Sequence, residues 1–142
     1  MDFVVDANIL FAAFIKNSTT RGILLTKTPM PLKLCTTPFI LEETYKYRTL
    51  LARKALLDEN DIMEVVLELI SASNIEIVKE SELSKFKNKA EKVSPRENDA
   101  PYFAVALYKN CKIWSNDRLL KHQDAVEVVT TKELLGILDS LR

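Results

Sequence analysis

Short apolar segments alternate with amphipathic segments along the whole chain, and this alternation limits the folds available to it. Phe3–Val5, Leu32–Thr36 and Ile75–Val78 are rich in β-branched or aromatic residues and are predicted as strands. Lys112–Ser115 and Val126–Val129 are the two later strand candidates. Five strands separated by helices favour a parallel sheet covered on both faces, because crossover helices pack on the sheet. We therefore predict an α/β fold, a three-layer α/β/α sandwich with a central parallel sheet of about five strands.

The segments between the predicted strands have the apolar spacing of helices. Apolar stretches at Ile9–Ile15 and Arg21–Lys27 follow the first strand, and Pro29 with Pro31 predicts a turn before the second. Capping boxes are predicted where an acid follows a capping side chain by three residues. Helices are predicted over Phe39–Leu57, from Asp61 (boxed with Glu64) to Ile70, over Glu82–Val93 and Asp99–Lys109, and from Thr130 (boxed with Glu133) to Leu141.

The length of 142 residues fits a single domain, 1–142, since domains usually run about 100–150 residues. Hydrophobic residues make up 47% of the sequence, enough for a sizeable core, and a charged fraction of 28% argues against disorder. The longest apolar runs, such as Ile9–Ile15, are too short to span a bilayer, which needs about 20 residues. The first residues lack the basic region of a secretory signal. We therefore expect a cytoplasmic protein with no membrane partner.

Several functional classes are excluded by the residues present. Gly22 and Gly136 are the only glycines, so the chain has no phosphate-cradling loop of the P-loop or dinucleotide-binding type. Cys35 and Cys111 have no C-x-x-C spacing and are expected to be buried, reduced thiols. His122, expected at the surface, cannot complete a zinc site with them. Twenty basic and twenty acidic residues cancel, so any nucleic-acid binding must come from how the charges are distributed.

A few acidic residues fall where separate segments can bring them together. Asp6 ends the first predicted strand, and Asp117 follows the fourth by two residues. Asp99 begins a helix that packs on the sheet, and Glu42 and Glu43 stand in the first turns of the helix after the second strand. Residues just past the carboxyl ends of parallel strands meet at one edge, so we expect these carboxylates there. The carboxyl oxygens of Asp6, Asp99 and Asp117 are predicted to lie within roughly 4–8 Å of one another.

Each acid alone has an ordinary structural explanation. Asp99 can be a helix N-cap, Asp117 a turn residue and Glu43 a helix-surface acid. Asp6 is harder to explain, because a carboxylate at the end of a buried strand is costly unless something pairs with it. Gathered carboxylates repel one another, so without a cation one or more of them would bind protons. An oxygen-lined pocket of this kind suits Mg²⁺ or Mn²⁺ and favours metal-assisted hydrolysis of a phosphate ester.

Four short motifs occur in order along the chain: V-V-D-A-N-I-L, T-P-F-I-L-E-E-T, N-D-A-P-Y-F-A-V-A-L and I-W-S-N-D-R-L-L. Together they resemble the acidic motifs of the PIN-domain nucleases, particularly the small prokaryotic members such as the VapC-type toxins. The resemblance spans residues 3–120. Each motif is short, and their order together with the fitting secondary structure gives the resemblance its specificity.

This resemblance implies that Asp6, Glu43, Asp99 and Asp117 are the catalytic residues and metal ligands. Glu42 is adjacent to Glu43, so the second acid is assigned by register alone. Glu43 is expected to point into the site and Glu42 away from it.

Three residues are predicted to orient these carboxylates by hydrogen bonding. Asn8 matches a polar support position of the family, and Ser115 matches a hydroxyl partner in the fourth motif. Asn116 is a further candidate for the same task. Glu97 lies close to Asp99 and is either an additional ligand or none.

The resemblance also implies a 3-2-1-4-5 parallel sheet, a Mg²⁺- or Mn²⁺-dependent endoribonuclease acting on RNA, and a homodimer. If the protein is a toxin, its partner is an antitoxin that covers the active site. Other family members act in RNA processing, and some bind RNA without cutting it. Neither the RNA target nor the use of one or two ions follows from the motifs.

Three basic residues flank the predicted acidic edge and are expected to contact substrate phosphates: Arg96, Arg118 and Lys121. An ordinary solubilising role fits each of them equally well. Three large aromatic residues are expected in the core: Trp114, Tyr102 and Tyr108.

Two other functions fit the same residues. A Mg²⁺-dependent phosphatase or phosphoryl-transfer domain would use Asp6 as an aspartyl nucleophile. Haloacid-dehalogenase-like enzymes carry a second aspartate where this chain has Asn8, and receiver domains carry one after the third strand, where Lys79 and Glu80 stand here. The third possibility is a non-catalytic PIN-like binding module that retains a weak metal site.

Overall fold

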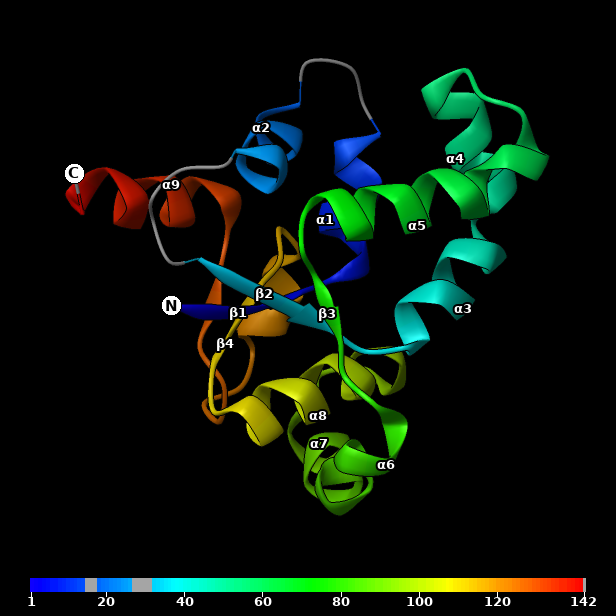
Figure 1. Ribbon diagram of the computed structural model, residues 1–142. Helices are drawn as coiled ribbons and strands as arrows, with labels where there is room; N and C mark the ends of the chain where they lie inside the picture. Colours follow the sequence, from blue (N-terminus) through cyan, green and yellow to red (C-terminus); the bar gives the residue numbers. More distant parts are fainter. Residues whose placement is uncertain (15–17, 27–31, 142) are drawn as a thin grey trace.

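The computed structural model describes residues 1–14, 18–26 and 32–141, and its elements are labelled in Figure 1. Ile15, Lys27, Pro29 and Pro31, which belonged to predicted helix ends and a turn, lie outside the described residues. The elements are β1 (Asp2–Val5), α1 (Ala7–Ala13), α2 (Thr19–Leu25), β2 (Lys33–Thr36), α3 (Phe39–Lys46), α4 (Arg48–Ala55), α5 (Ile62–Ala72), β3 (Glu76–Ile77), α6 (Glu80–Leu83), α7 (Lys87–Val93), α8 (Ala100–Lys109), β4 (Lys112–Trp114), β5 (Val128–Val129) and α9 (Thr131–Ser140), with 3₁₀ turns at Glu59–Asp61, Ser84–Phe86, Glu97–Asp99 and Arg118–Lys121.

The five strands form one parallel sheet in the order β3-β2-β1-β4-β5. β1 lies at the centre, with Val4 opposite Cys35 on β2 and opposite Ile113 on β4. The chain first adds β2 and β3 on one side of β1 and later β4 and β5 on the other, so the strand order reverses beside β1. In open parallel sheets, ligands bind at the carboxyl edge beside such a reversal. The predicted parallel α/β/α architecture and its strand order are confirmed.

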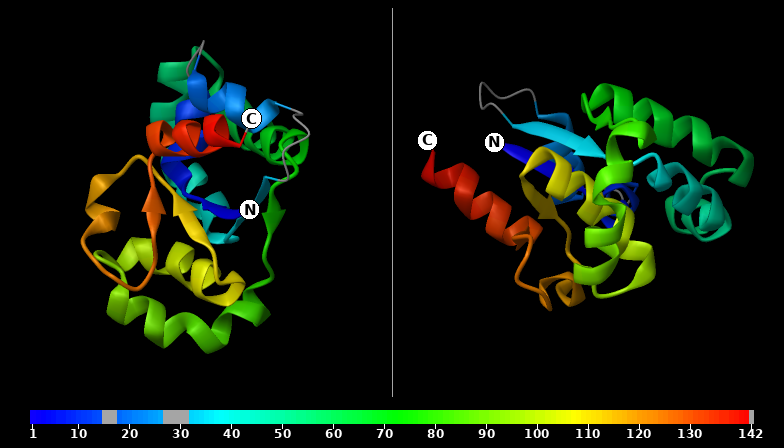
Figure 2. Two further views of the ribbon diagram at one scale, coloured as in Figure 1. Left: turned by 90° about the vertical axis from the view of Figure 1, so that its left-hand side faces the viewer. Right: turned by 90° about the horizontal axis from the view of Figure 1, so that it is seen from below.

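Helices cover both faces of the sheet, as Figure 1 and the left-hand view of Figure 2 show. On one face lie α6, α7 and α8, of which α8 contacts β1, β2 and β4. The other face carries α1, α2, α5 and α9, whereas α3 and α4 extend beyond the carboxyl end of β2. Helices from both layers therefore surround the carboxyl edge. None of the helices in the described ranges is long and apolar enough to cross a membrane.

The core contains two of the three aromatic residues predicted for it. Trp114 and Tyr102 are among the largest fully buried side chains. Tyr108 is only partly buried, and its ring packs edge-to-face on Phe86 with 5.9 Å between the centroids.

The two thiols and the histidine are distributed nearly as the sequence predicts. Cys35 is buried and Cys111 is partly buried, and both are free thiols. His122 is exposed.

Two segments predicted as single helices are divided. The Phe39–Leu57 segment forms α3 and α4, which meet at Tyr47, where the backbone leaves the helical conformation (φ −100°, ψ 11°). At this break the carbonyl oxygen of Tyr45 accepts from the N–H of Tyr47 and from Nη1 of Arg48 (2.8 Å). The Glu82–Val93 segment divides into the end of α6, a 3₁₀ turn and α7. Apolar periodicity did not reveal either break, because both parts keep their apolar faces on the core.

One of the two predicted capping boxes is present. The side chain of Thr130 accepts from the N–H of Glu133, and Glu133 in turn accepts from the N–H of Thr130. The capping box predicted at Asp61 is wrong. Asp58 instead has the extended backbone of an N-cap and accepts from the N–H of Asn60 (2.9 Å), whereas Asp61 is already helical and makes no such bond.

Candidate active site

The ends of β1 and β4 lie side by side at the carboxyl edge of the sheet. The N–H of Asp6 donates to the carbonyl oxygen of Trp114 (3.2 Å), and the N–H of Ser115 donates to that of Val129 (3.0 Å). Asp6 is also the N-cap of α1, because its Oδ1 accepts from the N–H of Ala7 (2.8 Å). A strand end followed directly by a helix start therefore holds this carboxylate at the edge.

Neutral donors surround the carboxylate of Asp6, which is only 8% exposed. Its Oδ2 accepts from Nδ2 of Asn8 (2.8 Å) and from Oγ of Ser115 (2.7 Å). Nδ2 of Asn8 also donates to Oγ of Ser115 (2.9 Å). The structure thus brings two of the three predicted orienting residues into direct contact with Asp6.

Burial raises the pKa of Asp6 from 3.8 to about 6, and hydrogen bonds from Ser115 and Ala7 partly oppose that shift. The negative charges of Glu43 and Asp99 raise the pKa of Asp6 further. These two acids, from α3 and the start of α8, therefore lie close enough to Asp6 to disfavour its charged form. A cation at this edge would reverse that effect.

Of the two adjacent glutamates, Glu43 belongs to this cluster. Its Oε1 accepts from the hydroxyl of Tyr102 (2.5 Å), whereas Glu42 is exposed. Burial raises the pKa of Glu43; the hydrogen bond from Tyr102 opposes the shift and the charge of Asp99 adds to it. Burial and the neighbouring charge of Glu43 raise the pKa of Tyr102, so its hydroxyl remains a donor to the carboxylate.

Tyr102 lies in the core, as predicted, but its contact with Glu43 was not predicted from the sequence. Two signals were available. Tyr102 lies three residues after Asp99, so both occupy neighbouring positions on one side of the helix. A buried tyrosine hydroxyl also usually needs a hydrogen-bond partner.

Arg96 lies between two of the predicted ligands. Its Nε donates to Oδ2 of Asp99 (2.9 Å), and its Nη2 donates to Oδ1 of Asp99 (3.1 Å) and to Oδ2 of Asp117. Bonds to both carboxylates raise the pKa of Arg96. Asp117 also caps a 3₁₀ turn, because its Oδ1 accepts from the N–H of Leu119 (3.1 Å). Glu97, the alternative ligand, is exposed.

The acids share one edge, but they do not form a preassembled metal site. Across residues 1–14, 18–26 and 32–141, no group of three His, Cys, Asp or Glu side chains is placed to hold a metal ion. The predicted convergence of Asp6, Asp99 and Asp117 on one ion therefore stays a prediction. In the described arrangement the guanidinium of Arg96 is bonded to Asp99 and Asp117. The donor chemistry itself fits Mg²⁺ or Mn²⁺, because every candidate ligand is a carboxylate and two of them are buried.

Asn116 supports the site through the backbone rather than through a carboxylate. Its N–H donates to Oδ1 of Asn8 (3.3 Å), and its Oδ1 accepts from the N–H of Thr131 at the start of α9 (2.8 Å). Asn116 thus connects the β4 end with α9 and steadies Asn8, in place of the predicted bond to an acid.

The other two basic residues predicted to contact phosphates have different surroundings. Lys121 forms an ion pair with Glu133, and this contact is the main cause that lowers the pKa of Glu133 to about 2. Arg118 is exposed and directly follows Asp117. Arg118 is therefore available to a ligand, whereas Arg96 and Lys121 would first have to leave acidic partners.

Comparison with protein families matches residues 4–136 to the PIN domain, a range that includes all four acids. Comparison with curated proteins finds no match.

Proposed function

Because this chain belongs to the PIN-domain family, and PIN domains are generally nucleases, we propose that it is a metal-dependent endoribonuclease that hydrolyses RNA phosphodiester bonds. The observation that carries the proposal is the gathering of acids from four separate segments at the carboxyl edge. Burial is the main cause that raises the pKa of Asp6, and the charges of Glu43 and Asp99 add to the rise; Asp99 also shares one guanidinium with Asp117. Arg96 and Lys46 oppose four carboxylates, so the edge keeps an excess of negative charge that a divalent cation would reduce.

Asp6, Asp99 and Asp117 would hold Mg²⁺ or Mn²⁺, with Glu43 completing the pocket. When bound, such an ion lowers the pKa of water and stabilises charge on the phosphoryl oxygens. The buried pair, Asp6 and Asp99, would provide the most restrained ligands, because rigid ligands lose least freedom on binding.

Three residues hold the acids in orientation. Asn8 and Ser115 restrain Oδ2 of Asp6, and Tyr102 restrains Oε1 of Glu43. Each donor is uncharged, so it orients a carboxylate without cancelling the charge that attracts a cation. At Asp6 and Glu43 this arrangement supports cation binding, whereas Asp99 and Asp117 pair with Arg96.

Arg96 has two successive roles in this proposal. Its guanidinium pairs with Asp99 and with Asp117. If these acids held a cation, Arg96 would be free to pair with a substrate phosphate beside the site. Arg118 contacts the same substrate backbone from the exposed side of Asp117.

The biological setting belongs to the same proposal. The protein acts in the cytoplasm as a homodimer, either as the toxin of a toxin–antitoxin pair or as an RNA-processing nuclease. A neighbouring reading frame that encodes a short DNA-binding protein would identify the toxin, since an antitoxin would be its inhibitor. Its absence would favour RNA processing.

A phosphatase that uses Asp6 as nucleophile receives less support. Both carboxyl oxygens of Asp6 already accept hydrogen bonds, and Asn8 supplies an amide where that chemistry uses a second acid. Turnover of a simple phosphomonoester with RNA left intact would favour this alternative. Metal and RNA binding without cleavage would favour a non-catalytic module.

The test is cleavage of single-stranded RNA across a titration of Mg²⁺ and of Mn²⁺. Asp6→Asn keeps the shape of the side chain but removes the charge, so we expect cleavage to fall by at least roughly 100-fold. Asp2→Asn is the matched control, because Asp2 is exposed at the opposite end of the same strand. Equal cleavage by the parent and Asp6→Asn would refute the proposal and point to a contaminating nuclease.

A further inference from the structure

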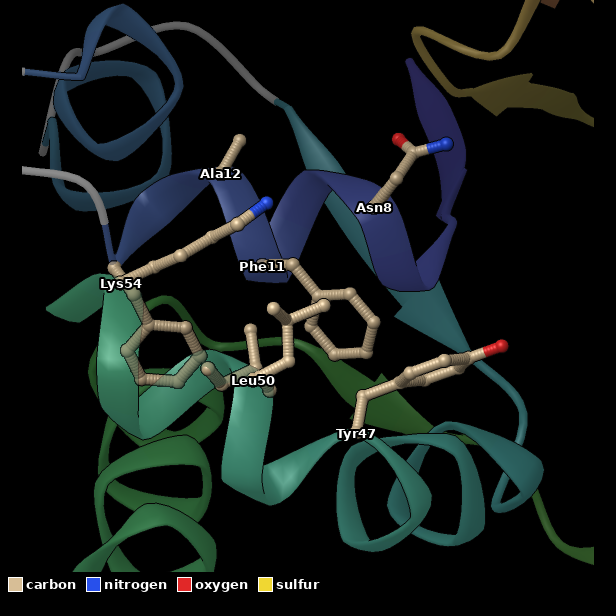
Figure 3. Close-up of a pocket in the computed structure, with 8 residues that line it drawn as sticks. Asn8, Phe11, Ala12, Tyr47, Leu50 and Lys54 are labelled. Atoms are coloured by element: carbon tan, nitrogen blue, oxygen red, sulfur yellow. The ribbon is translucent and has the colours of Figure 1, made fainter. Parts of the chain in front are cut away.

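A pocket of about 360 Å³ opens between α1 and α4, beside the acidic edge. Figure 3 shows Phe11 of α1 facing Tyr47 and Leu50, with Lys54 extending across toward α1. Asn8 lines the pocket and also donates to Oδ2 of Asp6, so it joins the pocket to the acids. Its volume lies within the range of small-ligand sites, which is about 300–1,000 Å³.

The pocket has an aromatic and aliphatic floor and a cationic rim. The rings of Phe11 and Tyr47 meet edge-to-face with 6.0 Å between their centroids. Tyr47 remains 38% exposed and Leu50 44% exposed, so apolar surface is left uncovered. Lys54 lines the pocket, and Nζ of Lys46 lies 5.4 Å from the centroid of the Tyr47 ring. The fitting ligand is therefore flat and apolar with a negative charge attached.

The pocket is continuous with the acidic edge through one helix. Asn8, Phe11 and Ala12 occupy one side of α1, since residues three and four apart are neighbours on a helix. Asn8 also donates to Oδ2 of Asp6. Phe11 follows Asn8 by three residues, a rise of about 4.5 Å along the helix axis. Asn8 therefore belongs both to the pocket lining and to the hydrogen-bond network of Asp6.

We propose that this pocket binds an unpaired nucleobase of the RNA, one that neighbours the phosphate at the acidic edge. The base stacks against Tyr47 and packs on Leu50, and Lys54 pairs with the adjoining phosphate. Bases of single-stranded RNA stack on aromatic side chains regardless of sequence. An apolar side chain of a partner protein would contact only the apolar residues of the pocket. A nucleotide would contact these residues and Lys54 as well, and its chain would continue toward the acids. This inference rests on the proposed function.

The experiment compares Tyr47→Leu with Tyr45→Leu in full-length protein. Tyr45 is the matched control, because it is 57% exposed and its ring stacks on Arg48 outside the pocket. RNA binding is measured by fluorescence anisotropy in the Asp6→Asn background, with labelled oligonucleotides of roughly 12 nucleotides. Cleavage by the otherwise unchanged protein gives KM and kcat separately. Leu50→Ala and thermal melts distinguish loss of the pocket from loss of folding.

We expect Tyr47→Leu to weaken RNA binding and raise KM by roughly tenfold, with kcat affected less, because stacking holds the substrate. Tyr45→Leu should leave both values unchanged. An abasic residue at the pocket position should weaken binding to the parent and have little further effect on Tyr47→Leu, because both changes remove one contact.

Equal RNA binding by Tyr47→Leu, Leu50→Ala and Tyr45→Leu would overturn the inference. Unchanged RNA binding together with loss of a dimer would overturn it as well and assign the pocket to a second copy of the chain. The proposed function fails separately, when the parent binds RNA through Tyr47 but does not cut it with either metal.

Discussion

Asp6 and Asp99 are almost equally buried, at 8% and 7% exposure, yet they are held in different ways. Asp6 is bound by uncharged donors alone, and the pKa of its carboxyl is raised to about 6. Asp99 is bound on both oxygens by the guanidinium of Arg96. The carboxylate of Asp6 thus keeps an uncompensated negative charge, whereas that of Asp99 already pairs with the positive charge of Arg96. Under the proposed function, a metal ion would find Asp6 without a charged partner, and it would compete with Arg96 for Asp99.

The largest expected effect is a loss of folding stability with rising pH, caused by the carboxyl group of Asp6. The pKa of Asp6 is higher in the folded protein, about 6, than its ordinary value of 3.8, so the folded state binds the proton more tightly. Metal-free protein therefore keeps this stability below about pH 4 and loses it as pH rises through about 6. The loss amounts to roughly 3 kcal/mol for this buried group.

Chemical denaturation from pH 4 to pH 7 in a chelator measures that loss, with Asp6→Asn as the comparison. The difference between the two proteins isolates Asp6 from other groups, such as Glu133, whose pKa is lowered to about 2. Parallel pH profiles for the two proteins would mean that Asp6 is not a destabilised carboxylate.

A second effect is expected at Asp99 and Asp117, the two acids that pair with Arg96. Arg96→Gln removes the charge that competes at Asp99 and Asp117, so Mn²⁺ should bind roughly tenfold more tightly. Without metal the same variant should be less stable by about 1 kcal/mol, because the guanidinium is half exposed and solvent screens its pairs.

Thermal melts across a Mn²⁺ titration test both expectations without relying on activity. Arg118→Gln serves as the control, since Arg118 is an exposed arginine that directly follows Asp117. If Mn²⁺ shifts the melting temperatures of Arg96→Gln and Arg118→Gln equally, Arg96 does not compete with the metal. The proposed difference between Asp6 and Asp99 in metal binding is then wrong.

The smallest effect concerns the tyrosine that supports Glu43. Tyr102→Phe removes the hydroxyl that donates to Oε1 and should cost about 1 kcal/mol of stability. Because Glu43 then loses its restraint, cleavage should fall by roughly tenfold. Tyr108→Phe, on the same helix but only partly buried, should change neither measurement. A cleavage rate equal to that of Tyr108→Phe would remove Tyr102 from the site.

The strand pattern, the strand-end position of Asp6 and the Thr130–Glu133 capping box were all readable from the sequence. Each depends on residues that are neighbours along the chain or that repeat with a fixed period. The family motifs added the strand order, and the order places the ends of β1 and β4 at one edge. The position of Glu43 in the second family motif favoured it over Glu42 as the site residue. In the structure Glu43 accepts a hydrogen bond from Tyr102.

Contacts between distant segments decided the rest. Arg96 bonds to Asp117, 21 positions away in the sequence, and Tyr102 bonds to Glu43, 59 positions away. Neither contact can be predicted from a spacing of neighbouring residues. The helix break at Tyr47 likewise left no signal in the apolar pattern, and the ring of Tyr47 contacts that of Phe11, 36 positions earlier in the chain. Sequence alone therefore determined which acids meet at the edge, because strand ends and helix starts are local features. Only the tertiary structure decided which cation, hydroxyl and ring surround them, because packing brings those groups together from separate parts of the chain.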